Sequence, residues 1–218
     1  MWFDVCIYVP YLNIRGLFVV NDSYKRPFDL LILLGTHILL SPVLVMLWII
    51  IPIAIWLEDR GPIFYTQERV GKNGKIFRLY KFRSMVVDAK NITGAVWATK
   101  NDPRITQVGN FLRKRALDEL PQTLNMWAGD LSLVGPRPER PEIMANIIKE
   151  LPEYSDRLSI KPGLTGVAQV FGRYSSEPKV KLKYDRIYSR HMSVVFDIKL
   201  LFLSVLYTLR AKWQENIR

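Results

Sequence analysis

The sequence contains a single cysteine, Cys6, so no disulfide can form within the chain. A reducing, cytosolic environment is therefore the default expectation. The sequence also lacks the Cys and His spacing of zinc sites, the phosphate-binding P-loop and the glycine pattern of dinucleotide-binding folds. The N-terminus has Asp4 where a signal peptide carries basic residues, and no small-residue cleavage site follows its apolar stretch. The sequence therefore predicts neither a disulfide scaffold nor a zinc finger, and it does not predict a signal peptide.

Positive charge is scarce in the first 60 residues and abundant afterwards. Residues 1–60 carry four Lys/Arg against five Asp/Glu, whereas residues 61–140 carry fourteen against seven and residues 141–218 carry thirteen against eight. The net charge of +11 therefore comes entirely from the chain after residue 60. Such a field attracts polyanions, which include nucleic acids, anionic lipid headgroups and phosphorylated small molecules. Charge alone does not choose among these partners.

The first 22 residues are apolar and aromatic but are interrupted by Asp4, Pro10, Arg15 and Gly16. This N-terminal extension, residues 1–22, is too interrupted for a membrane span. It fits an interfacial segment, a short paired strand or the remainder of something longer, and the residues do not decide among the three.

The longest uncharged run, residues 30–57, is the strongest membrane signal in the chain. As one straight helix, its 28 residues would extend about 42 Å at ~1.5 Å per residue, against about 30 Å for the hydrocarbon core of a bilayer. Pro42 divides the run into pieces of 12 and 15 residues, and we expect each piece alone to be too short to span. Pro42 also cannot donate a helical hydrogen bond to Ile38, so we expect a kink at Ser41-Pro42, with the Ser41 hydroxyl bonding a carbonyl one turn back.

Two membrane topologies fit this kinked segment, which we assign to residues 23–60. The helix can enter the bilayer, bend and leave by the same face, or it can cross the bilayer as a kinked span. Lys25 and Arg26 precede the run, and Arg60 and Arg69 follow it. Basic residues on both sides favour two cytoplasmic ends, but the residues alone leave both topologies open.

Residues 61–218 have the pattern of a soluble domain. Turn signals separate two short apolar runs, residues 63–65 and 76–80, which predict strands or a hairpin. The last helical stretch, residues 194–209, fits either a core helix or an interfacial helix whose basic and aromatic end, Arg210, Lys212 and Trp213, lies among headgroups. We also expect helices over residues 105–116, 120–127, 141–151 and 177–190, and turn-rich loops over residues 135–141 and 161–166.

Adjacent carboxylates at Asp118 and Glu119 precede Pro121, a residue suited to the first turn of a helix. We therefore expect Asp118 near the helix N-cap, where free N–H groups and the helix dipole favour a carboxylate or a phosphate. Arg113 and Arg115 lie within five residues and could neutralise a diphosphate. A carboxylate surrounded by positive charge can act as a nucleophile on phosphorus. The alternative is that Asp118 only caps the helix.

Other basic residues are candidates for phosphate contact. Prolines on both sides of Arg137 would present a preordered guanidinium at low entropic cost. Lys81 and Arg83 alternate with aromatic residues, and Arg104 follows an Asp-Pro turn before the next expected helix. The alternatives are a solvated proline-rich turn around Arg137 and a half-buried strand with a polar face around Lys81 and Arg83.

Taken together, these segments resemble the bacterial sugar transferases, the monotopic phosphoglycosyl transferases. The resemblance covers residues 24–212 and depends on the order of its segments rather than on any one of them. The segments are Lys25-Arg26-Pro27-Phe28-Asp29, Ser41-Pro42, Gly61-Pro62-Ile63-Phe64, Gln67-Glu68-Arg69-Val70-Gly71, Lys81-Phe82-Arg83-Ser84-Met85, Asp102-Pro103-Arg104-Ile105-Thr106, Leu117-Asp118-Glu119-Leu120-Pro121-Gln122, Ser132 to Glu139 and Lys161-Pro162-Gly163-Leu164-Thr165-Gly166.

With this resemblance, the predicted fold is α+β and mainly helical. It has a kinked re-entrant membrane helix at Ser41-Pro42 and a small cytosolic catalytic domain, residues 61–218, with interfacial amphipathic helices. The implied location is the cytoplasmic face of the bacterial inner (plasma) membrane. Long family members carry an extra membrane bundle before the catalytic domain. We therefore expect either a small member with an extended start or a fragment of a long one.

The resemblance further implies that Asp118 attacks the β-phosphate of a UDP-sugar and that UMP leaves. Polyprenol phosphate, normally undecaprenyl phosphate, would then take the phosphosugar from the aspartate. Mg²⁺ is the implied cofactor, with Asp118 and Glu119 as its implied ligands and with Glu119 assisting proton or metal handling. The implied substrate-binding residues are Arg113, Arg115, Arg137, Lys81, Arg83, Arg104 and Gln169, the last in a segment that departs from the family's more common aromatic after Gly166.

Two other functions compete with this one. A non-enzymatic basic, membrane-associated polyanion-binding protein would show salt-sensitive binding and no UMP release. The basic residues do not form one dense run, which argues against that function and against a nucleic-acid partner. A metal-dependent glycosyltransferase would release UDP instead of UMP. The expected partners are therefore a UDP-sugar, polyprenol phosphate and membrane lipids, and a homo-oligomer is compatible with the sequence.

Overall fold

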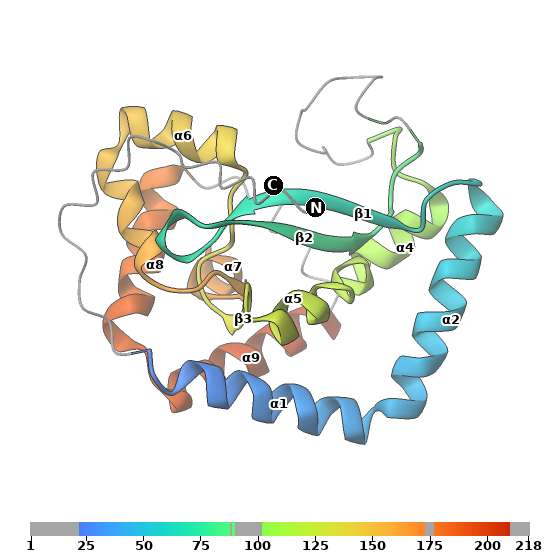
Figure 1. The fold of residues 1–218 in the computed structure, drawn as a ribbon, viewed down its shortest axis with the longest axis horizontal. Coiled ribbons are helices and arrows are strands. Elements are labelled where there is room, and N and C mark those ends of the chain that lie inside the picture. The colour runs from blue at the N-terminus through green and yellow to red at the C-terminus, as the bar shows by residue number, and fades with distance from the viewer. Residues whose placement is uncertain (1–21, 88, 90–101, 173–176, 210–218) are drawn as a thin grey trace, which may run out of the picture.

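The computed structural model describes residues 22–87, 89, 102–172 and 177–209, which are mainly helical with two small sheets, in agreement with the predicted α+β class (Figure 1). The extension up to residue 21 and the expected basic end of the last helix, Arg210, Lys212 and Trp213, lie outside these residues. In chain order the elements are α1 (Lys25–Leu39), α2 (Ser41–Glu58), β1 (Phe64–Val70), η1 (Lys72–Gly74), β2 (Ile76–Phe82), α4 (Gln107–Lys114), η2 (Leu117–Glu119), α5 (Gln122–Ala128), β3 (Ser132–Val134), α6 (Pro141–Glu150), η3 (Pro152–Ser159), β4 (Gly163–Thr165), α7 (Val167–Phe171), α8 (Pro178–His191) and α9 (Val194–Leu209).

The long apolar run forms two helices, because Pro42 interrupts the helical hydrogen bonds between them. Leu40 stands between α1 and α2 with φ −102° and ψ 13°. The Ser41 hydroxyl donates to the Ile38 carbonyl at 3.0 Å. Pro42 has no N–H and cannot donate to this carbonyl. Figure 1 shows the two helices meeting at a corner. The predicted kink and its compensating hydroxyl are confirmed.

The expectation that neither half of this run could span a membrane is wrong for the second half. By length and composition alone, α2 is long and apolar enough to cross, because its 18 residues include Ser41 and Pro42 before the 15-residue piece and Glu58 after it. Only 11% of this segment is buried within the protein. Most side chains of α2 therefore face away from the rest of the chain.

A buried ionic cluster fixes the start of α1 to β3, α8 and α9. The Lys25 ammonium, 4% exposed, donates to the Val134 carbonyl at 2.8 Å, the Tyr188 hydroxyl at 3.0 Å and Asp197 at 2.8 Å. Asp197 is fully buried and also accepts hydrogen bonds from the hydroxyls of Tyr24 and Tyr188. Lys25 thus uses all three of its donors inside the protein.

The opposite end of the helix pair is attached to the same body. Glu58, at the end of α2, accepts from the backbone N–H groups of Gln107 at 2.6 Å and Val108 at 3.0 Å. A carboxylate from another helix therefore caps the N-terminus of α4. The corner between α1 and α2 makes no such attachment within the described residues, and Leu39 there is 79% exposed.

The predicted hairpin is confirmed in β1 and β2, which pair antiparallel with Phe64 opposite Phe82. Its connection passes through Asn73 at φ 58°, a left-handed conformation that Asn tolerates better than most residues. Side chains of β2 join the main core with side chains from α1, α5, β3, α7, α8 and α9; the core includes Leu33, Phe77, Leu79, Met126, Leu133, Val167, Tyr188 and Leu200.

The segment expected as a turn-rich loop over residues 161–166 contains a strand, so that expectation is wrong in part. The strand β4 pairs parallel with β3, with Ser132 opposite Gly163 and Val134 opposite Thr165. The two backbones approach so closely that a Cβ on Gly163 would lie 2.0 Å from the nitrogen of Gly135. Glycine at this position is therefore required by the close packing of the two strands.

The last helix, α9, has one buried and one exposed apolar face: the buried face fits the core-helix interpretation, and the interfacial position stays a prediction. Asp197 and Leu200 are buried against the core, while Ile198 and Phe202 are 50% and 63% exposed. Large exposed apolar side chains also cover α1 and α2, and Phe111, Leu124 and Trp127 add to them from α4 and α5. An apolar surface of this size marks an interaction with a membrane or another protein.

Candidate active site

The short turn η2 places Asp118 and Glu119 side by side between α4 and α5. It follows Ala116, whose φ of 53° is uncommon for a residue other than glycine. The expected N-cap position of Asp118 is wrong, because Pro121 occupies the N-cap of α5. The chain reversal at Ala116 starts a separate turn, in which the Glu119 N–H donates to the Ala116 carbonyl at 3.2 Å. Asp118 therefore belongs to that turn and not to the N-terminus of α5.

Two cations from distant parts of the chain contact the acid pair. The Lys81 ammonium, from β2, lies 2.6 Å from Glu119 Oε1 and 4.0 Å from Asp118 Oδ2. The Arg137 guanidinium donates to the same Glu119 oxygen at 2.7 Å. Asp118 and Glu119 are 8% and 9% exposed, so these ion pairs are screened little by solvent. The structure thus brings together four of the residues that the sequence predicted for the site.

The two carboxyl groups have opposite pKa shifts. Burial raises the pKa of Asp118 above its ordinary value of 3.8; Lys81 partly offsets this rise, and the Glu119 carboxylate adds to it. Burial would also raise the pKa of Glu119, but Arg137 and Lys81 outweigh it, so that this pKa is lowered. Glu119 therefore carries a fixed negative charge. Asp118 is paired less closely with Lys81 than Glu119 is, so its carboxylate is the more basic of the two. A more basic carboxylate is a better nucleophile.

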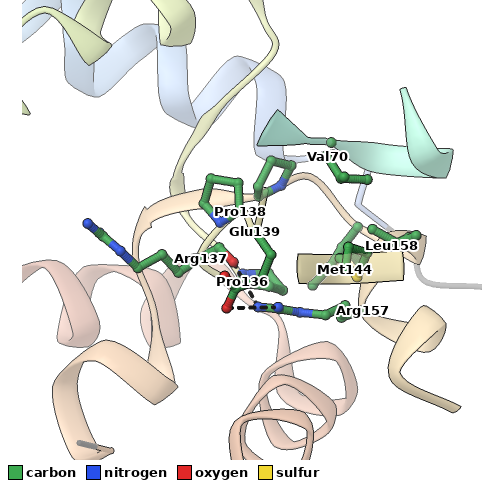
Figure 2. A pocket seen from close by; sticks show the side chains of 11 residues that line it. Val70, Pro136, Arg137, Pro138, Glu139, Met144, Arg157 and Leu158 are labelled. Carbon is green, nitrogen blue, oxygen red and sulfur yellow. Dashed lines mark hydrogen bonds and ion pairs between the residues drawn. The ribbon is translucent and has the colours of Figure 1, made fainter. Parts of the chain in front are cut away.

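The backbone of the Arg137 loop is held at four consecutive carbonyls, those of residues 136–139. Because the loop is fixed in this way, its one long cationic side chain has a defined direction. Figure 2 shows Arg137 extending away from Arg157, whose guanidinium lies beside Glu139. In order from residue 136, the four donors are the Gly163 N–H at 2.9 Å, the Arg157 guanidinium at 2.8 Å, the Arg69 guanidinium at 2.8 Å and the Val70 N–H at 3.0 Å.

Two other predicted phosphate-binding residues hold the chain near the site instead of contacting the acid pair. Arg83 is buried and donates to the backbone carbonyl of Asp59, after the end of α2. Arg104 is buried and makes a bidentate contact with Asp102, from Nε to Oδ1 at 2.8 Å and from Nη2 to Oδ2 at 2.5 Å. Both guanidinium groups are therefore engaged within the protein, and their predicted contact with substrate stays a prediction.

The remaining three predicted residues lie in α4, directly after it, and in α7. Arg113, in the last turn of α4, lowers the pKa of Asp118 by its charge. The Arg115 guanidinium lies 4.0 Å from the centre of the Phe111 ring. Gln169, in α7, donates weakly to the Gly135 carbonyl at 3.5 Å, beside the Arg137 loop. Of the three, Arg113 acts on the acid pair most directly.

Asp118 and Glu119 are suitable ligands for a magnesium ion. Over the described residues, no group of three or more His, Cys, Asp or Glu side chains forms a ready-made metal site. Mg²⁺ commonly takes one or two carboxylates and completes its coordination with water and substrate phosphates. Two adjacent hard oxygen donors fit that requirement.

A buried amide that holds α5 against the strand carrying Lys81 was not predicted from the sequence. Asn125, 1% exposed on α5, accepts from the Tyr80 N–H at 3.0 Å and donates to the Arg78 carbonyl at 2.7 Å. It thereby fixes α5 to β2, the strand that carries Lys81. A polar residue between Leu124 and Met126 is the signal that could have found it, because a buried amide needs partners.

The fold and site define a protein with a buried, cation-paired acid pair and a broad exposed apolar surface. The chain belongs to the bacterial sugar transferase family, whose model, described as "Bacterial sugar transferase", matches residues 20–211. It is 41% identical over 191 residues to a UDP-glucose:undecaprenyl-phosphate glucose-1-phosphate transferase of Escherichia coli (85% of this chain, 40% of that protein). It is 38% identical over 200 residues to an undecaprenyl-phosphate galactose phosphotransferase of Salmonella typhimurium (85% and 40%).

The chain thus spans less than half the length of these two relatives. A relative of more similar length is an exopolysaccharide production protein, PSS, of Rhizobium leguminosarum. It is 37% identical over 189 residues, which are 83% of this chain and 92% of that protein.

Proposed function

We propose that the chain is a phosphoglycosyl transferase that moves a sugar 1-phosphate from a UDP-sugar to polyprenol (undecaprenyl) phosphate. The observation that carries this proposal is the buried Asp118–Glu119 pair in contact with Lys81 and Arg137. Relatives named for transfer of glucose 1-phosphate or galactose phosphate to undecaprenyl phosphate support the reaction class. A polyanion-binding protein would need exposed cations and has no use for a buried acid pair.

In the first step, an Asp118 oxygen attacks the β-phosphorus of the donor. A carboxylate–phosphorus bond forms, the bond from that phosphorus to the bridging oxygen breaks, and UMP leaves with both electrons of that bond. In the second step, a phosphate oxygen of the polyprenol phosphate attacks the same phosphorus and frees the carboxylate. The product is a polyprenyl diphosphate sugar, a substrate for glycan assembly at the membrane.

The cations around Asp118 have a direct part in this chemistry. Lys81 and Arg137 now neutralise Glu119, and the Arg137 side chain remains 32% exposed. A bound diphosphate can therefore reach this guanidinium, which would stabilise the negative charge that spreads over the phosphoryl oxygens. Glu119 holds Lys81 and Arg137 in position beside the nucleophile.

Mg²⁺ is the proposed cofactor, held by Asp118 and Glu119, and it would supply additional positive charge to the phosphoryl group when bound. The remaining ligands would come from substrate and water.

The proposed membrane topology is re-entrant, with both ends of residues 23–60 at the cytoplasmic face. Lys25 and Glu58 attach the two ends of the helix pair to one body, whereas the corner at Leu39 is exposed and apolar. A spanning topology would need these two ends on opposite sides of a bilayer about 30 Å thick. The exposed faces of α4, α5 and α9 would then lie in the interface, where the phosphate of the lipid acceptor is found.

The test is a product assay with a panel of UDP-sugars, polyprenol phosphate and Mg²⁺. We expect UMP from at least one donor, together with a lipid-linked diphosphate sugar. Release of UDP would indicate a glycosyltransferase instead, and salt-sensitive lipid binding without any nucleotide release from the whole panel would support the polyanion-binding function.

The acid limb of the pH profile should report Asp118, because the nucleophile must be ionised. At subsaturating Mg²⁺, where the free enzyme carries no metal, its raised pKa places the loss of kcat/KM, as the pH falls, above the ordinary value of 3.8. Glu119 stays ionised over this range because its pKa is lowered. Since Arg137 lowers the pKa of Asp118, Arg137→Ala should move the acid limb of the pH profile to higher pH.

The control is Lys114→Ala, a change at an exposed residue at the end of α4, which should leave the acid limb in place. If the acid limb of the Arg137 variant stays in place or moves to lower pH, its assignment to Asp118 is contradicted.

A further inference from the structure

We propose that Arg157 is a positioning residue for catalysis: it holds the backbone carbonyl of Arg137, so that the Arg137 side chain points at the acid pair. This inference rests on the proposed function for its kinetic consequences. Its structural part, the anchoring of the loop, does not depend on what reaction the protein performs.

Arg157 is a buried cation whose observed contacts are all within the protein. Its side chain is 3% exposed, and its Nε lies 3.0 Å from a carboxylate oxygen of Asp185 on α8. One terminal nitrogen donates to the Tyr154 hydroxyl at 2.5 Å and lies 3.8 Å from Glu139, while the other donates to the Arg137 carbonyl at 2.8 Å. Because its side chain is buried and its guanidinium is engaged by protein groups, Arg157 is placed to act on the site through the loop.

A guanidinium suits this role because of its shape. Its rigid fork of donors spans the separate positions of Asp185, Tyr154 and the loop carbonyl, whereas an ammonium places its three donors around a single nitrogen. Its central carbon also lies over the Tyr154 ring, 4.7 Å from the ring centre. The position of the Arg137 carbonyl is thus set by a group that is itself held by η3 and α8.

The consequence for catalysis comes from the geometry of Arg137. Its carbonyl is bonded to Arg157 on one side of the loop, and its guanidinium is bonded to Glu119 on the other. If the carbonyl anchor is lost, the neighbouring carbonyls of residues 136, 138 and 139 still have donors of their own, but Arg137 itself loses its own backbone anchor and its guanidinium is held less precisely. Misplacement by about 1 Å can lower a rate about 100-fold.

The main test variant removes the buried pair together, as Arg157→Met with Asp185→Leu, because breaking only one partner would leave a buried charge unpaired. The control is Arg186→Gln. It breaks the Arg186–Asp156 ion pair, at 2.6 Å, which joins the same two elements, η3 and α8, without reaching the loop. Arg157→Lys, which keeps the charge beside Asp185, is the second variant if the first does not fold.

The first readout needs no activity: hydrogen exchange of the Val70 and Gly163 amides, which donate to the loop carbonyls of residues 139 and 136. We expect faster exchange in the Arg157 variant and no change in Arg186→Gln. Unchanged exchange at both amides in a folded Arg157 variant would overturn the anchoring role. This outcome can be read even if the wild-type protein releases no UMP from any UDP-sugar.

The second readout is a double-mutant cycle with Arg137→Ala on UMP release. We expect the Arg157 variant to lower kcat/KM by about 10- to 100-fold in the wild-type background and by less than about 2-fold once Arg137 is already absent. Equal, multiplying losses in both backgrounds would mean that Arg157 acts on the fold in general, and would overturn the positioning role. If the wild-type protein releases no UMP, the proposed function and the kinetic part of this inference are both refuted. The anchoring role is then still decided by hydrogen exchange.

Discussion

Asp118→Asn is expected to lower UMP release at least about 1,000-fold, the scale on which enzymes lose turnover when their nucleophile is removed. The amide is similar in size to the carboxylate but carries no charge and cannot form the bond to phosphorus. The measurement is the initial rate of UMP release with the active donor identified from the panel. Activity within about 10-fold of wild type would assign the nucleophile to another residue.

Loss of activity in this variant should not come from unfolding. Because burial raises the pKa of Asp118, the stability that this group contributes is fully present below its unfolded value and is lost as the pH rises through its folded value. An asparagine stays neutral throughout. Asp118→Asn should therefore melt at a higher temperature than wild type at neutral pH, and the difference should shrink as the pH falls. A lower melting temperature at neutral pH would contradict this assignment of charge and burial.

Lys25→Met is expected to give the largest loss of stability, about 3–5 kcal/mol, the usual cost of leaving a buried carboxylate without its cation. Asp197 has no exposed side-chain surface and lies 2.8 Å from the Lys25 ammonium. The Tyr24 and Tyr188 hydroxyls would still donate to it, but they carry no charge. The measurement is the free energy of unfolding in denaturant, in a detergent that keeps the protein soluble.

The matched control for this prediction is Lys75→Met. The Lys75 ammonium lies 3.7 Å from Asp130, and its side chain is 78% exposed, so that ion pair is worth about 1 kcal/mol or less. Equal destabilisation by the two changes would mean that the buried cluster does not hold α1 in place. Adding Asp197→Leu to Lys25→Met should recover much of the loss, because no unpaired charge would remain.

Local rules of sequence predicted the elements with strong chemical signals. Pro42 lacks the N–H that a helix needs, and the bend at Leu40 with its Ser41 hydrogen bond followed. Turn residues around Asn73 predicted the hairpin because few residues tolerate its left-handed backbone. By contrast, the same rules predict a loop where β4 forms. Its three residues pair with β3 across a long sequence separation, and Gly163 serves in a close strand contact that local turn rules do not describe.

The composition of the site was predictable, but its contacts were not. Asp118 and Glu119 are adjacent in sequence, so their proximity needed no structure. Lys81 and Arg137 reach Glu119 from segments 38 and 18 residues away, and only the packing of β2 and of the proline-bracketed loop brings them there. Arg83, in the same motif as Lys81, turns instead to Asp59. Spacing in sequence could not distinguish the two cations.

The most direct test is intact-mass and peptide mass spectrometry of the protein mixed with its active UDP-sugar while the lipid acceptor is withheld. We expect a mass increase equal to one sugar phosphate, mapped to Asp118, and we expect it to disappear when polyprenol phosphate is added. A protein that releases UMP rapidly but never carries this adduct, or carries it on another side chain, would contradict the proposed nucleophile.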